Sequence, residues 1–180
     1  VDGSGSKSIY AGSGTDRLVI SSITNLSSAT DLIMKNDGSY FKITLNDGSE
    51  ILAFNFEDFQ VNGVDYGVYD YSSSEIGGNG YGMVRGVFLD TATGVAYLSK
   101  VEIENYGPSG SSTTYVGGRM LGYFIDDDGK SSTTPNVTVT SVIGTSLADE
   151  LGASGNTWDD VTIDLGGGND FTGQIKISNK

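Results

Sequence analysis

The chain opens with Asp2-Gly-Ser-Gly-Ser-Lys-Ser-Ile-Tyr10, followed without a gap by Ala11-Gly-Ser-Gly-Thr-Asp-Arg-Leu-Val19, so one nine-residue pattern occurs twice. Its glycines permit tight turns with positive φ whose carbonyls point inward. The apolar residue near the end of each copy starts a short strand that faces a core. We therefore expect each copy to form half a coil of a parallel β-roll.

The second copy carries the groups that a calcium ion prefers, because Asp16 adds a carboxylate to the turn that Gly12 and Gly14 form. In the first copy Lys7 stands where that aspartate is expected, and this copy is compromised as a site. An ordinary glycine-rich turn is the alternative, although such a turn needs no aspartate at this offset. We predict calcium ligation by Gly12, Gly14 and Asp16.

The glycine-to-aspartate spacing returns near the other end of the chain, in Gly144-Thr-Ser-Leu-Ala-Asp149 and in Asp164-Leu-Gly-Gly-Gly-Asn-Asp170. We predict structural calcium ligands at Asp149, Asp164 and Asp170. Because the repeats bracket the middle of the chain, we expect 1–66 and 141–180 to lie together as one calcium-bound base. Residues 67–140 would project from this base as an insert that carries the binding surface, all within one domain, 1–180.

Between the repeats the sequence is typical of antiparallel strands. Asp-Gly and Asn-Gly turns at 36–38, 46–48 and 62–63 separate alternating runs and predict hairpins. The middle is richer in Tyr, Ser and Gly, and one short helix is possible near Ser146–Leu151. The predicted fold is all-β, with a β-sandwich-like body and calcium-binding β-roll turns contributed by both chain ends.

Composition limits the possible functions. The 23 acidic and 10 basic residues give a formal charge of -13, which repels phosphate backbones and anionic membranes and would be relieved by divalent cations. We therefore expect no nucleic-acid partner and no membrane insertion, and the sequence has no apolar run of bilayer length. Cys and His are both absent, which removes most catalytic and transition-metal chemistry. The chain looks excised from a longer one.

At the residues of both repeat regions the chain resembles the RTX, or haemolysin-type calcium-binding, family of secreted bacterial proteins. The stretch Phe56-Glu-Asp-Phe-Gln-Val-Asn-Gly63 also resembles the segment that commonly caps RTX repeats. Lys7 and Leu147 depart from the pattern, and Thr157-Trp-Asp159 interrupts its spacing. The resemblance therefore implies fewer calcium sites than a full array has.

Repeats around a Tyr/Ser/Gly-rich insert make the chain similar to the ligand-binding, peptide-binding domains of long RTX adhesins. That resemblance implies an extracellular place on a bacterial cell surface and a monomeric module within a multidomain chain. It also implies calcium-dependent capture of a peptide or protein C-terminus on a target cell. A calcium-stiffened extender of a stalk and a carbohydrate-binding module remain alternatives. An ice-binding surface is a weaker one, because the threonine runs are short.

Within the insert, Asp126, Asp127 and Asp128 precede Gly129 and are predicted to wrap a calcium ion with open coordination positions, which a peptide carboxylate could complete. A solvated hairpin tip is the alternative. Tyr106 and Tyr115 offer rigid amphipathic contact area, while tyrosine is also a common strand residue. Arg85 and Arg119 could clamp a ligand carboxylate or balance a neighbouring acid.

Catalytic pairings are weak. Glu102 and Glu104 stand two apart and would share one face of a strand, as a glycosidase pair could, but such a repeat is more often a solvated strand. We expect no enzymatic activity.

Overall fold

The computed structural model describes residues 5–35, 39–56, 58–69, 84–107, 110–120, 124–125, 137–152 and 161–172. Within these ranges the regular elements are strands, apart from one 3-10 turn at Leu26–Ser28. The expected all-β, sandwich-like fold is thus confirmed. The short helix expected near Ser146–Leu151 is wrong, because that stretch bends at Ser146 and ends in a strand.

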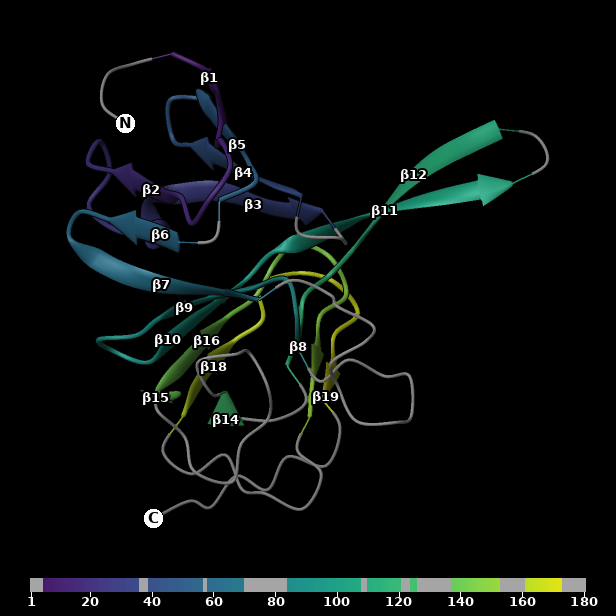
Figure 1. Cartoon of the computed structure of the whole chain (residues 1–180). Helices are drawn as coiled ribbons and strands as arrows, with labels where there is room; N and C mark the ends of the chain where they lie inside the picture. Colours follow the sequence, from purple (N-terminus) through teal and green to yellow (C-terminus); the bar gives the residue numbers. More distant parts are fainter. Residues whose placement is uncertain are drawn as a thin grey trace.

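Sheet A has six strands and includes the strand of the first repeat, β1, and a long hairpin, β11–β12, that stands away from the body (Figure 1). In spatial order its strands are β1 (Lys7–Tyr10), β5 (Glu50–Phe54), β4 (Tyr40–Leu45), β3 (Ala29–Lys35), β11 (Lys100–Gly107) and β12 (Gly110–Val116).

Sheet B has seven strands and runs through the middle of the molecule. In spatial order they are β18 (Thr162–Asp164), β16 (Ser141–Ile143), β10 (Val95–Leu98), β9 (Val87–Asp90), β7 (Val64–Tyr69), β6 (Asp58–Val61) and β2 (Arg17–Ile20).

Sheet C has four short strands, β19 (Phe171–Thr172), β17 (Glu150–Leu151), β13 (Arg119–Met120) and β8 (Val84–Arg85). A further pair joins β14 (Phe124–Ile125) to β15 (Val137–Thr138).

The nine-residue repeat forms the expected half coils. The first copy supplies β1 in sheet A, and the second supplies β2 in sheet B. The following coil passes between the same two sheets. Its strand β5 pairs in parallel with β1 in sheet A, and its strand β6 pairs in parallel with β2 in sheet B. Parallel pairing between successive coils is the signature of a β-roll.

The C-terminal repeats form a second set of coils. Strand β16 pairs in parallel with β18 through Ser141 and Thr162, and β17 pairs in parallel with β19 through Glu150 and Phe171. Both offsets are 21 residues. One coil is thus 21 residues long, and each coil has one strand in sheet B and one in sheet C. Strands β10 and β13, which pair in parallel with β16 and β17, form the preceding coil.

The coil strands of the two repeat regions do not adjoin as one base, although 1–66 and 141–180 do meet where Asp31 and Thr145 line one hollow. Strands β2 and β18 lie at opposite edges of sheet B, with β7, β9 and β10 among the strands between them. Residues that we expected to project as an insert instead form the centre of the sheet. The physical reason is that β9 and β10 are apolar on both faces and are stable only as a buried wall.

That wall separates two cores. Phe88 and Tyr97 belong to the core shared with sheet A, whereas Leu89 and Ala96 belong to the core shared with sheet C. Alternation of side chains along a strand places neighbours on opposite faces. The four residues of β9 are consequently all buried.

Two predicted turns are confirmed. Gly48 has φ +79 and lies between β4 and β5, which pair antiparallel. Asn62 and Gly63 both have positive φ between β6 and β7, the conformation that a type I′ hairpin turn requires. Residues 36–38 lie outside the described ranges, but the flanking strands β3 and β4 pair antiparallel as expected.

Candidate functional site

The C-terminal calcium candidates lie on turns whose backbones stack closely. Gly168 has φ +131, and a Cβ built on it would lie 2.4 Å from the carbonyl oxygen of Leu147 in the preceding coil. A Cβ on Gly117 would lie 2.2 Å from the carbonyl oxygen of Ala148. Only glycine permits this approach, so Gly117 and Gly168 serve packing between coils.

Asp149 holds these turns together through its side chain. The carboxylate is fully buried, and it accepts hydrogen bonds from the backbone N–H groups of Gly118 at 2.7 Å and Thr145 at 2.6 Å. The Thr145 hydroxyl donates a third at 3.1 Å. Burial raises the pKa of the Asp149 carboxyl above its usual value, although the hydrogen bonds from Thr145 and Gly118 oppose the rise.

Asp170 repeats this contact one coil later. Its carboxylate accepts the backbone N–H of Asp149 at 3.1 Å. The strand register makes Gly118, Asp149 and Asp170 equivalent positions, because Arg119 pairs with Glu150 and Glu150 with Phe171. Each aspartate thus bonds to the amide at its own position in the preceding coil, and we call this pair the aspartate ladder.

The carboxylate of Asp149 does not fit a calcium ligand in this geometry. N–H and O–H donors converge on both of its oxygens, and a cation would have to displace them. Asp164 accepts the backbone N–H of Gly166 at 3.1 Å and lies at the end of β18. Its exposed carboxylate keeps acceptor capacity.

The N-terminal turn fits a cation better. Gly14 has φ +124, nothing approaches the positions where Gly12 and Gly14 would carry a Cβ, and Asp16 Oδ2 is buried. Next to this turn, Arg17 pairs with Asp58 at 3.4 Å and with Asp65 at 3.3 Å. Those two carboxylates are therefore partly neutralised already.

Across the described ranges, no point gathers three or more Asp, Glu, His or Cys side chains that could hold a metal. A calcium ion at Asp16 would therefore take most of its ligands from backbone carbonyls, as Gly12 and Gly14 can offer. Asp126, Asp127 and Asp128 lie outside the described residues, and their predicted site stays a prediction.

Both predicted arginines are engaged within sheet C. Arg119 is opposite Arg85 across β13 and β8, and its guanidinium pairs with the carboxylate of Glu150. That contact lowers the pKa of the Glu150 carboxyl. Arg85 donates to the carbonyl of Gly117 at 3.0 Å. These contacts match the structural alternative for the two arginines.

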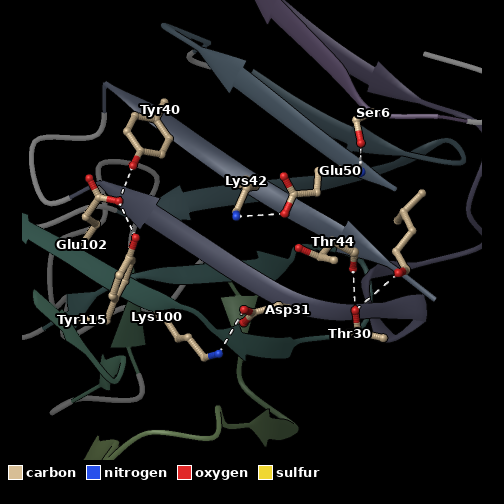
Figure 2. Close-up of polar contacts among 11 residues, drawn as sticks. Ser6, Thr30, Asp31, Tyr40, Lys42, Thr44, Glu50, Lys100, Glu102 and Tyr115 are labelled. Atoms are coloured by element: carbon tan, nitrogen blue, oxygen red, sulfur yellow. Dashed lines mark hydrogen bonds and ion pairs between the residues drawn. The ribbon is translucent and has the colours of Figure 1, made fainter. Parts of the chain in front are cut away.

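Of the two predicted tyrosines, Tyr115 lies on the outer face of sheet A and is 48% exposed. Its hydroxyl donates to Glu102 at 3.0 Å, and Tyr40 donates to the same oxygen at 2.5 Å (Figure 2). Hydrogen bonding to Glu102 raises the pKa of Tyr115, and burial together with Glu102 raises that of Tyr40. Tyr106 belongs to β11 and pairs with Ser111, and its side chain is outside the described part.

The main feature of the outer face of sheet A is a row of side chains that the sequence did not predict. Every strand of sheet A contributes one side chain to a single line across the outer face, and we call this line the cross-strand row. From β1 to β12 its members are Tyr10, Phe54, Tyr40, Lys35, Glu102 and Tyr115. Five strand spacings make the row about 24 Å long.

The row is ordered by direct contacts. The rings of Tyr10 and Phe54 stack with centroids 4.4 Å apart and planes 3° apart, and Phe54 meets Tyr40 at 5.5 Å. The Lys35 ammonium lies 5.9 Å from the centre of the Tyr40 ring and 3.3 Å from the carboxylate of Glu104. Glu102 and Glu104, weighed as a catalytic pair, are thus both held by neighbouring side chains.

A hollow of about 330 Å³ adjoins the Tyr115 end of this face. It is lined by Asp31, Ile33, Lys100 and Tyr115 of sheet A and by Leu147 from the turn between β16 and β17. Lys100 and Asp31 form an ion pair of 3.0 Å in it (Figure 2). Sheet A and the C-terminal coils therefore meet at a small cleft that combines one apolar wall with an ion pair.

Comparison with known proteins gives no relative from which to transfer a function. No protein-family model, no curated protein and no solved structure matches the chain. No helix in the described ranges has the length and apolar character needed to cross a membrane.

Proposed function

We propose that this chain is a calcium-dependent ligand-binding module of a bacterial surface adhesin, and that it takes an extended peptide as an added strand along β12. The observation that carries the proposal is the position of β12, which is the last strand of sheet A. Among the described strands, β12 has only β11 beside it.

The composition of β12 supports strand addition. Its seven residues, Gly-Ser-Ser-Thr-Thr-Tyr-Val, include no charge and no proline, and six of them are exposed. Proteins usually block an exposed edge with lysine, proline or a very short strand. The other described edge strands have at most four residues, and β1 and β2 carry Lys7 and Arg17. Only β12 combines length with the absence of these devices.

An added peptide would gain main-chain hydrogen bonds from β12 and side-chain contacts from the adjacent surface. Tyr115 projects from β12 beside the hollow, which can accept one apolar side chain of the peptide against Ile33 and Leu147. Lys100 offers an ammonium group in the same hollow, partly neutralised by Asp31. A free peptide carboxylate is the proposed partner of this ammonium group.

Calcium enters the proposal through the N-terminal coil. The turn at Gly12, Gly14 and Asp16 is joined to sheet A through β1 and to sheet B through β2. A cation held there would relieve charge repulsion in a chain of net charge -13 and stiffen the first coil. Chelation is expected to lower both the melting temperature and peptide affinity.

The experiment is a screen of peptides against the whole chain, with free and amidated C-termini, in calcium and in chelator. We expect extended peptides to bind in calcium, and free termini to bind more tightly than amidated ones. Equal affinity for both would remove the carboxylate from the proposal, and unchanged affinity in chelator would remove calcium.

A pair of variants tests the strand edge itself. Along β12, consecutive residues direct their N–H groups alternately toward β11 and away from it, toward the open edge. Of the neighbouring variants Ser112→Pro and Thr113→Pro, one therefore removes a donor to β11 and the other removes a donor at the open edge. The open-edge variant should lose peptide binding and keep the melting temperature of the wild type. If both variants bind peptide as the wild type does, β12 is not the binding edge, and an extender role without a ligand becomes the better reading.

A further inference from the structure

The outer face of sheet A carries a second feature that strand addition at β12 does not use. At the end of the cross-strand row away from β12, Tyr10 is 71% exposed although its ring is already stacked on Phe54. A large aromatic ring fixed with one face on a neighbour leaves its other face toward solvent. That open, rigid ring face is a stacking platform.

The middle of the row supplies fixed polar groups beside this platform. Glu102 is held by the hydroxyls of Tyr40 and Tyr115, and Lys35 is held by Glu104. In each case the contact fixes the side chain while leaving further donor or acceptor capacity. Hydroxyl groups, which both donate and accept, are the ligand groups that suit such a mixed array.

The charge of the face indicates the charge of the ligand. Its lysines pair with carboxylates in three places, Lys35 with Glu104, Lys42 with Glu50 and Lys100 with Asp31. With Glu102, the described residues of the face include three lysines and four carboxylates, an excess of one negative charge, in a chain of net charge -13. A nearly neutral face in so acidic a chain matches a neutral ligand.

We propose that the cross-strand row binds a neutral glycan, with one sugar ring stacked on Tyr10 and the following rings hydrogen-bonded to Lys35 and Glu102. The row crosses six strands and is about 24 Å long, which suits a linear oligosaccharide. The Tyr10 platform is separate from the peptide edge, because β1 and β12 lie at opposite ends of sheet A, whereas the far end of the row reaches Tyr115 on β12.

The test measures binding of neutral linear hexasaccharides, β-1,4-glucan, β-1,3-glucan and β-1,4-mannan, to the whole chain by calorimetry, with polygalacturonate as an anionic comparison. Tyr10→Ala should weaken the affinity about tenfold, whereas Tyr10→Phe keeps the ring and should bind as the wild type does. Phe171→Ala is the matched control, since Phe171 is also exposed, at 63%, but belongs to sheet C. Melting temperatures verify that all variants fold.

Four outcomes would overturn the proposal: no binding of any neutral hexasaccharide, equal affinity of Tyr10→Ala and the wild type, an equal loss in Phe171→Ala, or tighter binding of polygalacturonate. Loss of peptide binding in Tyr10→Ala without any glycan binding would assign the row to the peptide instead. If peptides fail to bind while the glycan result holds, the glycan site stands without the proposed function.

Discussion

Asp149 shows how one residue, through its carboxylate and its amide, can join three successive coils. Its oxygens accept hydrogen bonds from Gly118 in the coil before it and from Thr145 in its own turn, while its amide donates to Asp170 in the coil after it. A buried carboxylate is stable only with such donors. The glycine-to-aspartate spacing that predicts a calcium ligand here also serves an internal hydrogen-bond ladder.

Replacing this side chain should be costly. Asp149→Ala leaves the buried N–H groups of Gly118 and Thr145 without their acceptor, and we expect a loss of about 3 kcal/mol in the free energy of unfolding. Denaturant unfolding measures it. Asp170→Ala, which removes one bond at the more open end of the ladder, should cost less, and equal losses would contradict the burial argument.

Glu150 gives a prediction with a defined sign in pH. Its pKa is lowered by the hydrogen bond and charge of Arg119, so the contact stabilises the fold above the unfolded pKa near 4.5 and is lost as pH falls through the lowered pKa. Glu150→Gln should therefore destabilise the chain at pH 7 by about 1 kcal/mol or less.

The difference between the wild type and Glu150→Gln should shrink as the pH is lowered below 4.5. Thermal unfolding from pH 3 to pH 7 measures it. The control is Glu150→Gln combined with Arg119→Met, because the charge of Glu150 should matter little once Arg119 is gone. A pH-independent difference would show that packing, not charge, connects the two residues.

At the scale of elements, the turns between coils depend on glycine at some positions only. Gly168→Ala places a Cβ 2.4 Å from the Leu147 carbonyl at a positive φ, and it should cost about 2 kcal/mol or more. Gly167→Ala meets nothing within 4 Å and has an ordinary φ, so it should be neutral or slightly stabilising. The melting temperatures of the two variants test this: a loss in Gly168→Ala alone indicates close packing between coils, whereas equal losses would indicate that the turn only needs flexible residues.

Local sequence was sufficient for elements that form from neighbouring residues. Asn62-Gly63 predicts its hairpin because asparagine and glycine are among the few residues that readily adopt positive φ at both turn positions, and the tandem nonapeptide predicts parallel coils from its period. The cross-strand row could not be predicted in this way. Tyr10 and Phe54 meet only because β1 pairs with β5, a non-local register that neither residue's surroundings specify.

The same limit explains why the strands of the two repeat regions were wrongly expected to lie side by side. Similar repeats at both ends suggested that they pack together, but pairing of strands depends on which surfaces remain uncovered. Strand β9 is apolar at Val87, Phe88 and Leu89, and it requires a sheet on each side. The signal was present in this continuous apolar run, which is typical of strands buried on both faces.

For the whole molecule, the shared wall of β9 and β10 should make the two cores unfold together. Phe88 packs with sheet A, and the next residue, Leu89, packs with the C-terminal coils. Removing either side chain loosens the same strand and therefore weakens both cores. Each of Phe88→Ala and Leu89→Ala should cost about 3–4 kcal/mol.

Hydrogen exchange measured by mass spectrometry can separate this cooperative behaviour from two independent units. In Leu89→Ala, protection should fall by similar factors in β4, which belongs to the first core, and in β17, which belongs to the second. Leu151→Ala, a change in the second core on β17 of sheet C and not on the wall itself, is the comparison variant. If Leu89→Ala lowers protection in β17 alone, sheet B does not couple the two coil regions, and an ion bound at Asp16 could not influence the C-terminal coils through it.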